Sequence, residues 1–132
     1  MTSMSDILKA STTATIVDLN RLSAAIEALD GAERTTTACA AAMSGGEMGS
    51  AVRYDLDCVD ICHTTRQVLT RASADASVLR GLLQSTIAAC ERSSAECGRH
   101  AEHHGHCRLC SEGTRAAAAA CRALLDDLAS RV

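Results

Sequence analysis

The stretch CRLCSEGTRAAAAACRALLDDL, residues 107–128, decides the fold. It is rich in alanine and leucine, which have high helix propensities, and it contains no proline. Cys110 follows Cys107 by three residues and Cys121 follows Cys110 by eleven, so an α-helix places all three thiols on one face. The arginines of the segment fall mostly off this stripe. The pattern predicts one long helix, from about His106 to Ser130, whose cysteines point inward.

The rest of the chain has the same character. Its 132 residues include no proline, tryptophan or phenylalanine, and they lack the β-branched and aromatic runs typical of strands. We therefore predict an all-α fold, an antiparallel up-down-up-down four-helix bundle with short loops. One domain is expected over residues 1–132, with residues 1–12 either frayed or folded as a short extra helix. The predicted helices run from Asp6 or Thr15 to Met43 (with a bend or break allowed at Gly31), from Glu47 to Ala72, from Ser77 to His103 and from His106 to Ser130.

Charge and hydropathy argue against several classes of function. The formal net charge is -3, and a single tyrosine is the only aromatic side chain apart from histidine, so nucleic-acid binding is not expected. No apolar run is long enough to span a membrane. The first residues have neither the basic nor the apolar region of a secretory signal. We therefore expect a cytoplasmic protein, whose reducing environment favours metal-binding or catalytic cysteines over disulfides.

The cysteines recur at helical spacings. Cys58 and Cys62 are four residues apart and Cys90 and Cys97 are seven apart, so each pair falls on one face of its predicted helix. Free cysteine is often an ordinary buried residue. Seven thiols aligned on three helices, in a core without phenylalanine or tryptophan, nevertheless favour ligands for a soft metal ion. The candidate ligands are Cys39, Cys58, Cys62, Cys90, Cys97, Cys107, Cys110 and Cys121.

Helix rise predicts the depth of each thiol. If the segments near residues 44–48 and 103–106 lie at the same end, the cysteines sort into two groups of four, about 10 Å apart. The group within roughly 9 Å of that end contains Cys39, Cys97, Cys107 and Cys110. The group roughly 15–22 Å below it contains Cys58, Cys62, Cys90 and Cys121.

The same end is rich in histidine and methionine. His106, directly before Cys107, and His100 are candidate transient ligands at an entrance. The thioethers of Met43 and Met48 are further candidates, and thioether ligands favour Cu(I). The neighbouring histidines at 103 and 104 are expected to be solvated.

Several stretches resemble the cytosolic bacterial copper-storage proteins. They are YDLDCVDIC at residues 54–62, CERSSAECGRHAEH at residues 90–103, HCRLC at residues 106–110 and CRALL at residues 121–125. The likeness covers roughly residues 30–126 and is most specific at HCRLC. It implies a cysteine-rich four-helix bundle that holds many Cu(I) ions along its core on cysteine pairs, and assembly as a homo-oligomer.

The chain departs from that family pattern in its cysteine count. Only Cys58 and Cys62 remain as an i, i+4 pair. The resemblance therefore implies the family fold and soft-metal binding in discrete sites, with fewer ions than a continuous tube of thiolates would hold. Family-like spacing would place further cysteines near Thr36, Met43, Ala51, Thr86, Ser93, Thr114 and Ala117.

Cu(I) binding, for storage or buffering, is the leading interpretation. An iron–sulfur electron-transfer protein and a structural Zn protein remain alternatives, because four cysteines can hold either a cluster or a zinc ion. An enzyme is not expected, since the sequence has no nucleophile–base arrangement and no glycine-rich phosphate loop. The expected partners are metal ions and further copies of the chain; a metal-delivery partner cannot be identified from the sequence.

Overall fold

In a computed structural model that describes residues 2–11, 15–43 and 49–131, the regular secondary structure of these residues is α-helix. These ranges contain five helices and no strand. The all-α prediction is therefore confirmed, but the described ranges hold five helices where four were predicted. The additional one is the short N-terminal helix that the sequence allowed. The helices are α1 (Met4–Ser11), α2 (Leu19–Met43), α3 (Gly49–Thr70), α4 (Ala76–Gly98) and α5 (Gly105–Ser130).

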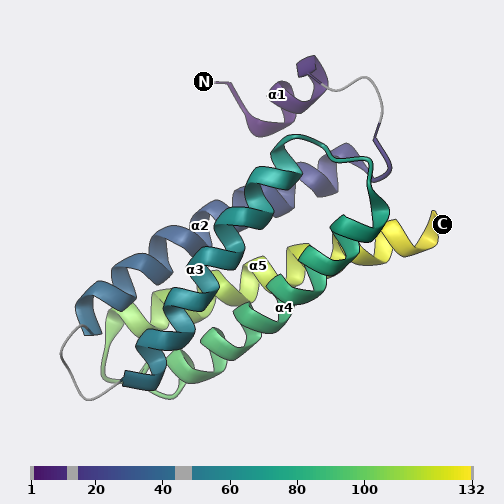
Figure 1. Cartoon of the computed structure of the whole chain (residues 1–132). Coiled ribbons are helices and arrows are strands. Elements are labelled where there is room, and N and C mark those ends of the chain that lie inside the picture. Colours follow the sequence, from purple (N-terminus) through teal and green to yellow (C-terminus); the bar gives the residue numbers. More distant parts are fainter. Residues whose placement is uncertain (1, 12–14, 44–48, 132) are drawn as a thin grey trace.

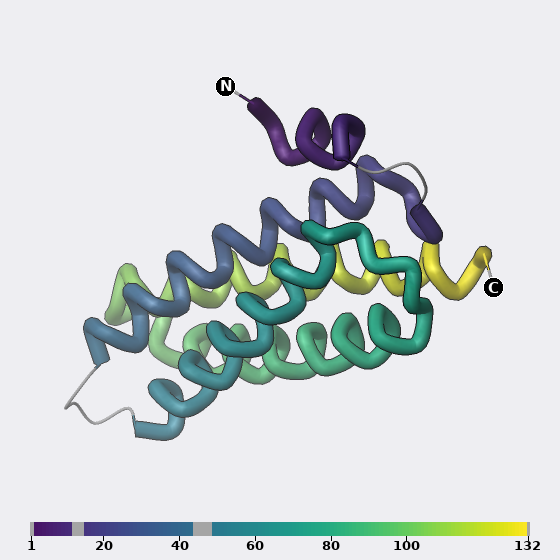
Figure 2. Tube along the Cα trace, turned by 45° about the horizontal axis from the view of Figure 1, so that its top comes forward, coloured from purple at the N-terminus to yellow at the C-terminus, as the bar shows by residue number. Residues whose placement is uncertain are grey.

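The four long helices enclose a common core. α2 packs against α3 and α5, and α4 packs against the same two helices. Consecutive long helices run in opposite directions (Figure 1). The end of α2, the start of α3 and the α4–α5 turn therefore lie at one end, as the depth argument assumed, while the C-terminus lies at the other (Figures 1 and 2). α1 packs on α2.

Several helix limits differ from the predicted ones, and the bend or break allowed at Gly31 does not occur. α2 continues through Gly31 without a break. α4 ends at Gly98, five residues before the predicted end at His103. The main chain tightens there, because the N–H groups of His100 and Ala101 bond to carbonyls only three residues back, at 3.0 and 3.4 Å. The His-rich segment is consequently a series of turns and not a continuation of the helix.

The start of α4 has a clear local cause. The carboxylate of Asp75 accepts hydrogen bonds from the N–H groups of Ser77 and Val78, each at 3.1 Å. These bonds satisfy two of the helix's unpaired N-terminal donors. α4 thus begins within one residue of its predicted start at Ser77.

The core changes in composition along its length. Towards the chain termini it is built mainly from buried leucines, among them Leu22, Leu69, Leu83 and Leu128. Towards the α4–α5 turn a second cluster combines Met43 and Ala51 with four cysteines, Cys39, Cys97, Cys107 and Cys110. Within the described ranges no helix is both long and apolar enough to cross a bilayer. The leucine-rich part also contains Cys58, Cys62, Cys90 and Cys121, so both parts of the core carry four thiols.

Candidate metal centre

All eight cysteine thiols lie inside the protein. Each cysteine is 0% exposed and none forms a disulfide. This burial follows from the helical spacing, since the inward face of each long helix carries its cysteines at intervals of about one turn or multiples of it. Eight free thiols buried together can serve a soft metal ion without competition from solvent.

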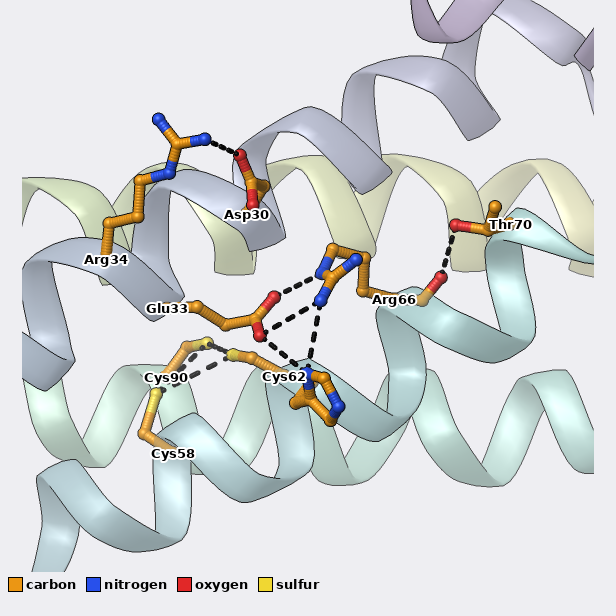
Figure 3. A network of polar contacts seen from close by, with 9 residues as sticks. Asp30, Glu33, Arg34, Cys58, Cys62, Arg66, Thr70 and Cys90 are labelled. Atoms are coloured by element: carbon orange, nitrogen blue, oxygen red, sulfur yellow. Dashed lines mark hydrogen bonds and ion pairs between the residues drawn. The ribbon is translucent and has the colours of Figure 1, made fainter. Parts of the chain in front are cut away.

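Three of the deeper thiols form a compact group, here called the lower triad: Cys58, Cys62 and Cys90. The Sγ atoms are 3.8 Å apart for Cys58–Cys62, 3.7 Å for Cys58–Cys90 and 3.5 Å for Cys62–Cys90. Figure 3 shows the three sulfurs converging between α3 and α4. Cys121 is buried in the same apolar cluster but lies outside this group of ligand atoms. The deeper group is therefore a triad with one separate thiol.

A network of polar side chains links α2 to α3 beside the lower triad (Figure 3). The carboxylate of Glu33 on α2 accepts from the guanidinium of Arg66 on α3 and lies 2.9 Å from Nδ1 of His63. Glu33 is largely buried, with its side chain 14% exposed, so its ion pair with Arg66 is shielded from solvent. This network holds in place the helix that supplies two of the three thiols.

The remaining four cysteines gather nearer the α4–α5 turn and are here called the upper set: Cys39, Cys97, Cys107 and Cys110. Cys39 Sγ lies 3.9 Å from Cys97 Sγ and 4.0 Å from Cys107 Sγ, and Cys97 Sγ lies 3.5 Å from Cys110 Sγ. The set draws on α2, α4 and α5, as the depth argument predicted.

A glycine allows α5 to approach α2 close to the upper set. A Cβ atom on Gly113 would lie only 2.6 Å from the hydroxyl oxygen of Thr35, so a larger residue there would require the Thr35 side chain to rotate or the two helices to separate. Gly113 is one turn after Cys110, whose thiol contacts the Thr36 hydroxyl on α2 at 3.6 Å. The close approach of the helices therefore helps to place thiols from both of them in one site.

Asp55 is a further residue of this site, and it was not among the ligands predicted from the sequence. It is 0% exposed, and its Oδ1 atom accepts from Ser93 at 2.9 Å and from the thiols of Cys97 and Cys110 at 3.4 and 3.6 Å. Its Oδ2 atom is buried without a hydrogen-bond partner. Burial raises the pKa of this carboxyl above the usual aspartate value, although the Ser93 hydroxyl opposes the shift.

A signal for Asp55 was present in the sequence. It lies three residues before Cys58, so on a helix it shares the inward face with the thiols. A carboxylate on a buried face is rare unless it is paired with a cation or coordinates a metal ion. Asp55, Cys39, Cys97 and Cys110 bring their ligand atoms within 4.8 Å of one another, an arrangement that could hold a metal ion.

His106 closes the outer side of the upper set. Its Nδ1 atom lies 3.3 Å from Cys39 Sγ and 3.4 Å from Cys107 Sγ. His100 is half-buried and its Nε2 atom lies 4.0 Å from Glu96 Oε1, so the structure brings its ring to a carboxylate and not to the thiols. His103 and His104 are exposed, as expected for solvated side chains.

The two methionine candidates differ in what the structure describes. Met43 is 2% exposed and belongs to the same cluster as the upper-set cysteines. Met48 lies outside the described residues.

The seven positions at which family-like spacing would place further cysteines are all buried, at 2% exposure or less. The reduced cysteine set therefore leaves hydroxyl, methyl and thioether groups at these positions in the core.

Burial also affects the acidity of the thiols. It raises the pKa of Cys39 and of Cys107, and it raises the pKa of Cys121 to about 12. These thiols are therefore protonated near neutral pH in the metal-free protein. Because the thiolate is the metal ligand, occupation of the site must displace protons.

A family model described as copper storage protein matches residues 18–126 of the chain. The structure also resembles that of the copper storage protein Ccsp from Streptomyces lividans, loaded with 10 copper equivalents, at 34% sequence identity and a TM-score of 0.88. The alignment covers 95% of this chain and 99% of that one. No curated protein matched this chain.

A second solved structure gives a similar result. It describes copper loading, with five coppers, of a cytosolic copper storage protein from Streptomyces lividans. The identity is 36%, the TM-score is 0.78, and the alignment covers 81% of this chain and 93% of that one. The resemblance inferred from the sequence motifs is therefore confirmed at the level of fold and family.

Proposed function

The chain belongs to the copper storage protein family, and we propose that it binds and stores Cu(I) on the thiolates of its core. The observation that carries this proposal is the convergence of seven buried free thiols in two groups, one of which includes a buried carboxylate oxygen without a partner. Clustered neutral thiols gain little from one another, whereas clustered thiolates around a soft monovalent cation gain much.

Each group of ligands has its own role in this proposal. In the upper set, Cys39, Cys97, Cys107 and Cys110 provide thiolates, while Asp55 and His106 add one oxygen and one nitrogen ligand. The lower triad offers thiolates alone. Cys121 is buried between the helices as a further thiol that a growing cluster can recruit.

The residues near the α4–α5 turn are proposed to serve uptake. Met43 supplies a thioether beside the upper set, and His100 offers a half-buried imidazole close to the surface. Met48 remains a candidate ligand by sequence alone. A Cu(I) ion passing from weaker imidazole and thioether ligands to thiolates would move towards progressively softer donors.

We further propose that the four long helices form a single antiparallel up-down-up-down bundle domain with α1 attached. The opposite directions of neighbouring helices support this architecture (Figure 2). A cytoplasmic location is supported by the free thiols and by the cytosolic description of the Streptomyces lividans relative. Assembly as a homo-oligomer and a binding function without catalysis complete the proposal.

Titration of the reduced, metal-free protein with Cu(I) under anaerobic conditions, against a chromogenic Cu(I) chelator, tests the function. We expect the protein to withhold several Cu(I) ions per chain from the chelator and to remain colourless. A protein that yields all copper to the chelator would refute the proposal. Brown protein with acid-labile sulfide would instead support the iron–sulfur alternative, and retention of Zn alone would support a structural zinc site.

The same titration should depend on pH. Because burial raises the pKa of thiols such as Cys39 and Cys107, each copper–thiolate bond to such a thiol displaces one proton, and competition for copper should strengthen as the pH rises. The expected gain is about tenfold in affinity per pH unit for each displaced proton. Affinities equal at two values one pH unit apart would contradict binding to thiols that are protonated in the free protein.

A further inference from the structure

The lower triad differs from the upper set in that its close ligand atoms are all sulfur. Its three Sγ–Sγ distances, 3.8, 3.7 and 3.5 Å, form a nearly equilateral triangle. Dividing their mean by √3 places the centre of the triangle about 2.1 Å from each sulfur. An atom bonded to all three at about 2.3 Å, the length of a Zn–thiolate bond, would lie about 0.9 Å out of the sulfur plane. The triad is therefore preformed for one pyramidal, three-coordinate centre.

Charge also distinguishes this site. Its three cysteines are 0% exposed and belong to the leucine-rich cluster. Three thiolates around a single monovalent ion would leave a net charge of -2 in an apolar interior, which is costly. Three Cu(I) ions would neutralise the three thiolates, and so would one trivalent centre. The triad is thus suited either to a small copper cluster or to a single trivalent thiophilic atom.

We propose that the lower triad is also a binding site for trivalent arsenic, taken up as arsenous acid. The neutral molecule As(OH)₃ reacts with the three thiols to give As(SCys)₃ and three molecules of water. Three S–H and three As–O bonds break, while three As–S and three O–H bonds form. No atom changes oxidation state, and both the entering molecule and the product are neutral. The lone pair of arsenic(III) makes its complex with three thiolates pyramidal, which matches the geometry of the triad.

The upper set is a poorer site for the same atom. The thiols of Cys97 and Cys110 donate to the buried Oδ1 atom of Asp55, whose Oδ2 atom already has no partner. Bonding arsenic to these two sulfurs would remove both S–H donors. Of the three groups that donate to the buried Asp55 carboxyl, the Ser93 hydroxyl alone would then be left. The lower triad loses no such bond, so arsenic should occupy it selectively.

Native mass spectrometry of the reduced, metal-free protein after equilibration with arsenite tests this proposal. We expect one arsenic atom per chain in the wild type and none in the Cys62→Ser variant, which keeps a small polar side chain. The matched control is Cys121→Ala, which removes a buried thiol of the same cluster but leaves the triad intact, and it should bind one arsenic. Circular dichroism verifies that each variant is folded, and Cys90→Ser provides a second disruption of the triad.

Several results would overturn the assignment. The wild type could bind no arsenic, or it could bind two arsenic atoms per chain. Folded Cys62→Ser and Cys90→Ser could retain arsenic, or Cys121→Ala could lose it. Because the count is made without copper, it is independent of the copper titration. Copper added to the arsenic-loaded protein should still fill the upper set, and complete exclusion of copper would contradict binding confined to the triad.

Discussion

A variant in which Cys58 and Cys62 are both alanine is expected to lose the copper of the lower triad and to keep that of the upper set. The change removes two of three thiols whose sulfurs lie within 3.8 Å of one another, and the remaining Cys90 cannot hold a cluster alone. If each cluster is neutral, with one Cu(I) per thiolate, the chain should lose about three copper ions. Copper counted per chain after removal of unbound metal measures this loss.

The reciprocal variant makes the test specific. Replacing Cys107 and Cys110 by alanine should remove most upper-set copper, leave that of the lower triad, and slow uptake if the His-rich end is the entrance. Cys121→Ala removes a buried thiol outside both groups and should lose no more than the copper that this single thiol recruits. If either double variant loses all of its copper, the two groups act as one cooperative cluster. If neither loses any, the cysteines only fill the core.

Replacing Asp55 by asparagine is expected to have opposite effects on stability and on copper binding. Burial raises the pKa of Asp55 in the folded protein above its unfolded value, so the stability it contributes is present at low pH and is lost as the pH rises through the folded pKa. Asparagine keeps the shape without the buried charge. Near neutral pH the metal-free variant should therefore be more stable by about 1–3 kcal/mol, while the upper set should bind copper more weakly.

Urea denaturation of the metal-free proteins at acidic and neutral pH measures the first effect. The stability advantage of Asp55→Asn should grow with pH, because only the wild type must keep the carboxylate buried. Asp57→Asn is the matched control, since Asp57 is an exposed aspartate on the same helix and should change neither property. A variant less stable than the wild type at neutral pH would indicate that Asp55 acts mainly as a structural hydrogen-bond acceptor. Unchanged copper binding would remove it from the ligand set.

The sequence was sufficient to predict the helices and the burial of the thiols. The period of 3.6 residues sets which side chains share a face, so the spacings of Cys58–Cys62 and Cys107–Cys110 predicted their inward direction. Rise per residue also separated the cysteines by depth. It failed to exclude Cys121 from the lower group, because rise fixes the height of a side chain but not its direction around the core.

Other features depended on contacts that no local pattern specifies. The carboxyl of Asp55 is held by Ser93 on α4 and by thiols of α4 and α5, which are distant in sequence. The end of α4 at Gly98 depends on main-chain bonds that tighten the turn. Asp55 could have been recognised as a polar residue on the buried face of a cysteine-bearing helix. The same criterion can be used to find acidic site residues in related sequences.

Anomalous diffraction at the copper edge, from crystals of the reduced protein loaded anaerobically with Cu(I), tests the central claim most directly. We expect two separate groups of copper atoms in the core. One should be bounded by the upper-set cysteines with Asp55 and His106, and the other should lie at the lower triad. Copper found only on surface histidines such as His103 and His104, with the buried thiols free of metal, would contradict it.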